Sequence, residues 1–356
     1  MAETPKKINV GLNLLRIVLT FGVVLDHFWI RDSPGTLTGI ERAVWHMRTL
    51  AVPAFMTMTF FFTADHFRAG DASWLKKRFV RLYEPFIFWA LAYWVLRMGV
   101  SVFNPEYATS FHDLAWQLVL GSSRTLTMQF WFHADLIILT AAFFLAFRVV
   151  RIAKANLYLA LGAIAVGFTV QYTPLNAMMF SGMGFETKYP LGRVFAMLPY
   201  AGAGFLMAAA KRRIDALSAG EKVVSALFGL WLAWFVIYWN VCPNPHEVVG
   251  YEGLGMNLIA WGVMAAFYHI PFHRLPAAFE KAVLAVSRYA MGVYCVHLAL
   301  GWLFYDYVLR LPKIETSYGE MRAFSFAACL AVWALSYAFC ALFARIPLGI
   351  CRRVVE

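Results

Sequence analysis

Two ionisable residues in the first apolar segment have types and spacing suited to chemistry inside a membrane. Arg16 and His27 are eleven residues apart, which on an α-helix gives about three turns, roughly 20° of rotation and about 16 Å of rise. They therefore share one helix face at two depths, and this pattern indicates two ends of a channel. Ionisable side chains within hydrocarbon are expensive and are usually functional. The alternative is that Arg16 reaches the lipid headgroups and His27 caps a helix end.

A second basic group follows the second apolar segment. Arg78 and Arg81 are three residues apart, so on a helix they share a face. Two guanidiniums placed in this way can bind a phosphate group. Taken alone, the pattern is equally well explained as a topology signal or a contact with anionic lipid.

Membrane-spanning helices must position these residues. The 356-residue chain is 61% hydrophobic and 14% charged, against about 45–50% and about 25% in soluble domains. Apolar runs close to the roughly 20 residues that cross a bilayer recur along the chain. We expect an all-α polytopic membrane protein of about ten transmembrane helices that forms a single domain over residues 1–356. The predicted spans are 9–30, 44–66, 84–103, 129–149, 156–173, 190–210, 222–241, 253–272, 284–308 and 323–345.

The charge pattern predicts the orientation of the chain. Most loop Lys and Arg residues lie in alternate connections and in both terminal segments, and the positive-inside rule then places both termini in the cytoplasm. The net charge of +11 is spread over short loops, which argues against nucleic-acid binding. The cysteines lack CxxC spacing and the histidines lack repeated ligand spacing, so no disulfide framework or metal site is expected. Residues 201–204 form a small-residue face that predicts close helix packing.

Five motifs, in this order and spacing, resemble the bacterial acyltransferase-3 family of integral membrane acyltransferases, and the resemblance covers nearly the whole chain. The motifs are Leu12-Asn13-Leu14-Leu15-Arg16 running to His27, Val52-Pro53-Ala54-Phe55 leading to Thr59, Arg78-Phe79-Val80-Arg81 followed by Pro85, Gln129-Phe130-Trp131-Phe132, and Ser287 through Tyr294 to His297. Asn13 replaces the usual Asp of the family, Thr59-Phe60 replaces the common Ser-Gly pair, and residues 290–296 follow the late motif only loosely. The extracytoplasmic esterase-like domain fused to some relatives is missing, so the resemblance implies a stand-alone transferase.

The resemblance implies an acyl-CoA donor and no metal. The nucleotide of acetyl-CoA, the co-substrate, would bind at the cytoplasmic face near Lys77, Arg78 and Arg81. Its pantetheine arm would pass Arg16 and bring the thioester to a hydroxyl near His27. An imidazole can remove that proton at neutral pH, so the predicted catalytic residues are His27 and Arg16.

Several further residues are candidates for the acceptor site. The fourth span places three of them near the depth of His27, while Asp26 points about 100° away from its neighbour His27 and is therefore a poor orienting partner. For each candidate, a structural hydrogen bond between helices is an equally good explanation. His297, with Tyr294 one turn away, is expected to be a buried structural histidine. The acceptor-site candidates are Asp26, Trp131, His133, Asp135, Glu186 and Arg193.

The expected activity is transfer of an acetyl group across a bacterial inner membrane to a hydroxyl of a cell-surface or exported polysaccharide or other glycan. The partners would be acyl-CoA, a glycan or lipid-linked saccharide acceptor, membrane lipids and polysaccharide biosynthesis machinery. The main alternative is a transporter or flippase of a lipid-linked sugar, because many helices with buried charge also describe carriers. A third is a binding or assembly subunit of a polysaccharide export complex without chemistry of its own.

Overall fold

The described part of the chain is helical, and the computed structural model contains no strand within it. The described residues are 9–28, 39–121, 129–150, 152, 154–179, 181, 185–241, 253–270, 275–304 and 318–356. The helices are α1 (Val10–Phe28), α2 (Gly39–Ala69), α3 (Ala72–Ser101), η2 (Pro105–Tyr107), α4 (Phe111–Leu120), α5 (Trp131–Val149), α6 (Ala155–Tyr172), α7 (Leu175–Met179), α8 (Phe185–Ala216), α9 (Ala219–Val241), α10 (Leu254–His269), α11 (Ala277–Ser287), α12 (Ala290–Leu303), α13 (Tyr318–Phe343) and α14 (Gly349–Arg353).

The fold is that of a polytopic membrane protein, as the composition predicts. Within the described residues, seven helices are long and apolar enough to cross a membrane, or up to eight if one bent pair forms a single span. Every predicted span overlaps a helix. The total of ten spans and the cytoplasmic position of both termini remain predictions.

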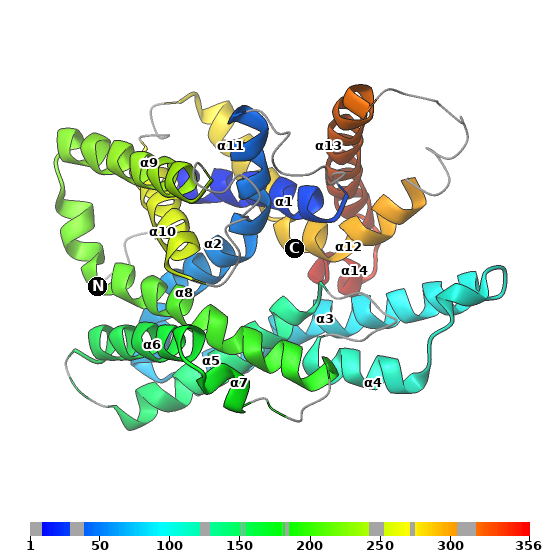
Figure 1. Cartoon of the computed structure of the whole chain (residues 1–356), viewed down its shortest axis with the longest axis horizontal. Helices are drawn as coiled ribbons and strands as arrows, with labels where there is room; N and C mark the ends of the chain where they lie inside the picture. Colours follow the sequence, from blue (N-terminus) through cyan, green and yellow to red (C-terminus); the bar gives the residue numbers. More distant parts are fainter. Residues whose placement is uncertain are drawn as a thin grey trace.

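Helix α1 has a central place in the bundle. It packs against α2, α10, α11, α12 and α13, and in Figure 1 it lies between α2 and α10 on one side and α12 and α13 on the other. Its core face is apolar and includes Leu12, Leu15 and Leu19, all nearly fully buried. This face fixes the rotation of the helix, and it therefore determines which neighbours Arg16 and His27 meet.

The small-residue face of α8 allows its neighbours to approach closely, as predicted. A Cβ atom at Gly202 would lie 2.7 Å from the carbonyl oxygen of Ala160 in α6, and one at Gly204 would lie 2.5 Å from that of Thr57 in α2. Neither position has room for a side chain. Helices α2, α6 and α8 thus form one tightly packed group. This group holds the part of α2 whose residues Thr59 and Thr63 line the pocket described below.

The predicted ninth span is broken rather than continuous. Helices α11 and α12 meet at an angle of 57° around residues 288 and 289. The polar residues Ser287 and Arg288 interrupt the apolar run at this point, but they do not by themselves reveal the angle of the bend. The bend separates Ser287, at the end of α11, from Tyr294 and His297 in α12.

Helix α4 is an additional element outside the predicted spans. Ser110 and Asp113 form a capping box at its start, and Gly121 ends it with φ of 71°, a left-handed conformation that glycine adopts without strain. It packs along α3, where the indole of Trp94 donates a hydrogen bond to the carbonyl of Ser110 over 3.2 Å.

Substitution of Gly204 tests the close packing of α8 on α2. Gly204→Ala should destabilise the protein by about 1–3 kcal/mol, because the added methyl group overlaps backbone that cannot move away cheaply. Gly162→Ala in α6 is the matched control, since nothing lies within 4 Å of a Cβ atom there. The measurement is the thermal unfolding midpoint of each purified variant in detergent. Equal midpoints would contradict the packing.

Candidate functional site

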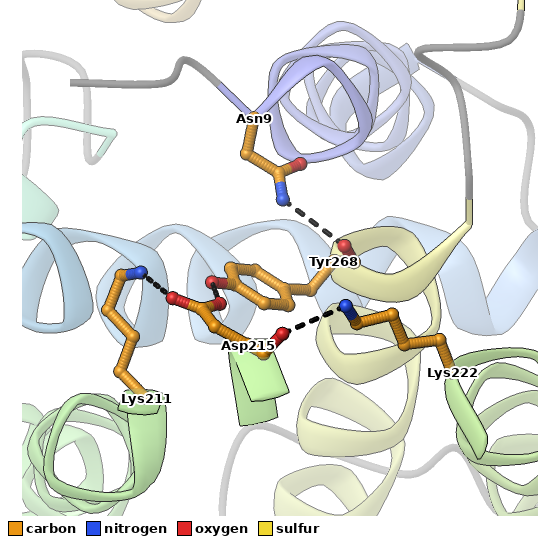
Figure 2. A network of polar contacts seen from close by, with 5 residues as sticks. All are labelled: Asn9, Lys211, Asp215, Lys222 and Tyr268. Carbon is orange, nitrogen blue, oxygen red and sulfur yellow. Dashed lines mark hydrogen bonds and ion pairs between the residues drawn. The ribbon is translucent and has the colours of Figure 1, made fainter. Parts of the chain in front are cut away.

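Polar contacts hold the start of α1 in place. Asn9 accepts a hydrogen bond from the backbone of Leu12 over 2.9 Å and donates one to the carbonyl of Tyr268 over 3.2 Å. Figure 2 shows how this contact continues: the hydroxyl of Tyr268 donates to the carboxylate of Asp215, which also pairs with Lys211, and Lys222 donates to the Asp215 carbonyl over 2.9 Å. The network joins α1 to the ends of α8, α9 and α10.

Two further contacts fix α1 along its length. The hydroxyl of Ser287 donates to the side-chain carbonyl of Asn13 over 3.1 Å, so the first and last sequence motifs meet in space. Thr20 shares a hydrogen bond of 3.0 Å with Tyr337 and accepts one of 2.9 Å from the indole of Trp333. These contacts restrict rotation of α1, so the directions of Arg16 and His27 are set by packing.

Arg16, which is exposed, lines a pocket between five helices. The pocket has a volume of about 130 Å³ and is lined by residues of α1, α2, α3, α5 and α12. Two guanidiniums, Arg16 and Arg78, reach it from different helices, and Thr59 and Thr63 add hydroxyls. The other lining residues are Phe55, Met58, Phe62, Phe132, Ala290, Met291 and Tyr294. A cavity with two cations and an aromatic wall suits an anionic ligand that also carries an apolar arm.

The other two predicted donor-binding residues lie outside this pocket. Arg81 and Lys77 are both exposed, whereas Arg78 is half-buried. Neither Arg81 nor Lys77 is among the lining residues. The pair that converges on one space is therefore Arg16 with Arg78, not Arg78 with Arg81.

His27 lies beside a second histidine. The centre of its ring is 5.2 Å from that of His297 in α12. From His297 the ring contacts continue to Tyr294 at 6.1 Å and from Tyr294 to His133 at 5.5 Å. Because Tyr294 also lines the pocket of Arg16 and Arg78, side-chain contacts connect the predicted base with the predicted donor pocket.

His297 is buried, as expected of a structural histidine, but only one of its two ring nitrogens is hydrogen-bonded within the described residues. This side chain is fully buried, and its Nδ1 atom lies 2.8 Å from the carbonyl oxygen of Tyr294 and 3.2 Å from that of Val293. Its Nε2 atom has no hydrogen-bond partner in the described part of the chain. Buried polar atoms are normally paired, so this unpaired nitrogen makes His297 a candidate for the site.

Asp26 forms an ion pair instead of pointing toward His27. Its carboxylate lies 3.4 Å from a guanidinium nitrogen of Arg48 in α2, and the two side chains are 22% and 7% exposed. Removing one partner of a buried ion pair leaves an uncompensated charge and is strongly destabilising. This contact supports the structural explanation for Asp26.

The remaining acceptor-site candidates lie along the contact between α5 and α8. The guanidinium of Arg193 lies 4.2 Å from the ring centre of Trp131. His133 and Asp135 are fully buried, and within the described residues neither ring nitrogen of His133 and neither carboxylate oxygen of Asp135 has a hydrogen-bond partner. These orphan groups keep both residues as acceptor-site candidates. The side chain of Glu186 lies outside the described residues.

Sequence reasoning missed the partners supplied by distant helices. Arg48 was not singled out, although a second intramembrane charge of opposite sign to Asp26 is a usable signal. The role of Thr59 in lining the pocket, and the approach of His297 to His27, depend on helix rotation and packing. No spacing within one segment reveals them.

Comparison with known families supports one assignment. A family model described as an acyltransferase domain, that of the acyltransferase-3 family, matches residues 9–344. The comparisons with curated proteins and with solved structures find no match.

The ion pair of Asp26 gives a prediction about stability. Asp26→Asn should lower the free energy of unfolding by about 1–3 kcal/mol, because the buried guanidinium of Arg48 then faces a neutral amide. Asp65→Asn is the matched control: its ion pair with Arg68 is 67% and 61% exposed, and exposed pairs contribute less than about 1 kcal/mol. Thermal unfolding in detergent compares the two variants. If Asp26→Asn unfolds like wild type but loses acyl transfer, Asp26 belongs to the acceptor site.

Proposed function

Because the chain belongs to the acyltransferase-3 family, we propose that it transfers an acetyl group from cytoplasmic acetyl-CoA to a hydroxyl of a cell-surface or exported glycan, within a bacterial inner membrane. The observation that carries the proposal is the connection between two sites. Arg16 and Arg78 line one pocket, and Tyr294 and His297 join that pocket to His27. A donor binds at the first site and a hydroxyl at the second.

The pocket supplies what an acyl-CoA donor requires. Its two guanidiniums favour phosphate oxygens over neutral groups, and charge-assisted hydrogen bonds are about twice as strong as neutral ones. The aromatic and methionine lining suits the uncharged pantetheine arm. Arg16 and His27 are about 16 Å apart along α1, so one reacting carbonyl does not touch both. Arg16 holds the donor while His27 serves the hydroxyl.

The transfer step follows from these positions. The acceptor oxygen attacks the thioester carbonyl, so that a C–O bond forms and the C–S bond breaks. His27 takes the hydroxyl proton during the attack and passes it to the departing sulfur, which leaves as the free thiol of coenzyme A. No net proton is gained or lost, and the enzyme returns to its starting state.

Unpaired polar groups support an acceptor site near His27. His133 contacts Tyr294, and its buried nitrogens, like the oxygens of Asp135, have no hydrogen-bond partner among the described residues. Sugar hydroxyls both donate and accept hydrogen bonds, so they can satisfy such groups. The Trp131 ring with Arg193 above it adds an aromatic surface of the kind that contacts sugar rings.

The competing function is transport of a lipid-linked sugar. The bend between α11 and α12 is the observation in its favour, because carriers use broken helices at their binding sites. The two functions differ in the fate of the thioester. A carrier leaves acetyl-CoA intact when it is supplied with a glycan, whereas a transferase releases free thiol in proportion to ester formed.

Loss of the proposed base should stop the transfer. His27→Ala should lower the rate of thiol release in the presence of glycan by roughly 10²–10⁴-fold, the usual contribution of a positioned base, while membrane insertion persists. His112→Ala is the control: this residue lies on α4, where it accepts a hydrogen bond of 2.9 Å from the indole of Trp116, and the variant should react at the wild-type rate. Normal transfer by His27→Ala would eliminate the proposed base.

Loss of the basic residues should weaken donor binding. Arg78→Ala with Arg81→Ala should raise the KM for acetyl-CoA about tenfold or more and change kcat little, because the pocket loses the guanidinium of Arg78 and its charged hydrogen bond to the donor; Arg81 lies outside the pocket. Arg212→Ala with Arg213→Ala removes the same charge from exposed positions at the end of α8 and serves as the control. If donor affinity is unchanged in the first double variant, the pair serves topology alone.

A further inference from the structure

His297 has one nitrogen fixed and one left open toward its surroundings. Two backbone carbonyls, at 2.8 and 3.2 Å, face its Nδ1 atom, and carbonyl oxygens only accept hydrogen bonds. In the neutral imidazole, Nδ1 therefore carries the proton. The Nε2 atom is then a pure acceptor, and within the described residues it has no partner.

His27 is the ring within reach of that acceptor. Two imidazoles joined by an N–H···N hydrogen bond of about 2.9 Å have ring centres about 5 Å apart. The measured separation is 5.2 Å, with 38° between the planes. A small rotation of the more exposed ring, His27, aligns one of its N–H groups with the Nε2 atom of His297.

The hydroxyl of Tyr93 shapes the helical turn that carries His297. It donates to the carbonyl of Cys295 and accepts from the amide of Ala299, each over 2.9 Å. In a regular α-helix these two backbone groups would bond each other. A side chain that enters this ladder opens and bends the helix. His297 lies midway between Cys295 and Ala299, the two residues of α12 that Tyr93 bonds.

Other contacts hold this arrangement from neighbouring elements. Gln129 donates to the same Cys295 carbonyl over 3.5 Å and accepts from the hydroxyl of Tyr294 through its own carbonyl. A Cβ atom at Gly301 would lie 1.9 Å from the ring of Phe28, so α12 approaches the end of α1 only because this residue is glycine. The approach places His27 and His297 side by side.

We propose that His297 is a positioning residue for His27, and that Tyr93 holds the helical turn that carries His297. The proposal rests on the proposed function, in which His27 is the base. The Nε2 atom of His297 accepts an N–H···N hydrogen bond from His27. This bond selects the tautomer of His27 in which the other ring nitrogen is unprotonated and can take the proton of the acceptor hydroxyl. When His27 has taken the proton, the same bond stabilises the resulting imidazolium. A carboxylate has this task in serine hydrolases; here the acceptor is a neutral imidazole.

The test compares the loss of the acceptor with its replacement. His297→Leu should lower kcat about 10- to 100-fold, the effect seen for partners that orient metal-bound histidines, and leave the KM for acetyl-CoA unchanged. His297→Gln should retain more activity, because its side-chain carbonyl can accept in place of Nε2. In the His27→Ala background, adding His297→Leu should cause no further loss, because the two residues act as one unit.

Tyr93→Phe is a near-isosteric second test that does not depend on His297→Leu folding. Without the hydroxyl, both hydrogen bonds from α3 to this turn of α12 are lost and His297 is held less firmly, so kcat should fall while the donor KM stays constant. Tyr172→Phe is the control. The Tyr172 hydroxyl also accepts a hydrogen bond from a helix amide, that of Leu254, over 2.8 Å, but it joins α6 to α10 and not α3 to α12. The kcat of this variant should match that of the wild type.

The outcomes separate this proposal from the proposed function. Wild-type kcat in His297→Leu, with His27→Ala inactive, would overturn the role of His297 and leave the base intact. Equal losses in His297→Leu and His297→Gln, with a further loss in the double variant, would show a role in folding alone and would also overturn it. Full activity of His27→Ala would refute the base itself.

Discussion

The structure depends on the cost of placing charged and polar side chains among apolar helices. A single apolar helix, α1, carries a guanidinium near its start and an imidazole near its end, and such groups are expensive within a membrane. Five helices pack against α1, and α3 adds Arg78 to the pocket that Arg16 lines. Arg16 faces a pocket with Arg78, and Asp26 pairs with Arg48. These contacts come from different helices, α3 and α2.

The same constraint explains the local irregularities near His27. The hydroxyl of Tyr93, from α3, makes two hydrogen bonds to the backbone of α12, one to Cys295 and one from Ala299. Gly301 removes a side chain where Phe28 must pack. These features cost little stability in themselves. Their effect is to bring His297 to His27, and they are the kind of local departure from regular structure that proteins concentrate at functional sites.

The sequence predicted the class of fold and one face of the site. Apolar length and composition predicted the spans, and the eleven-residue spacing placed Arg16 and His27 on one face because helix geometry is fixed by the backbone. The partners were harder to predict. Arg81 has the same type and helix face as Arg78 but lies outside the pocket, and the polar pair Ser287-Arg288 does not by itself predict a bend of 57°. Contacts such as His27 with His297 join residues 270 positions apart, and only tertiary packing decides them.

The central claim is that donor and acceptor meet within one bundle although they arrive from opposite faces of the membrane. The most direct measurement uses the purified protein in sealed vesicles, with acetyl-CoA enclosed inside and a glycan present only outside. Mass spectrometry of the external glycan should then show an added acetyl group, with free thiol released inside. Ester formation only when both substrates are on the same side would contradict this account.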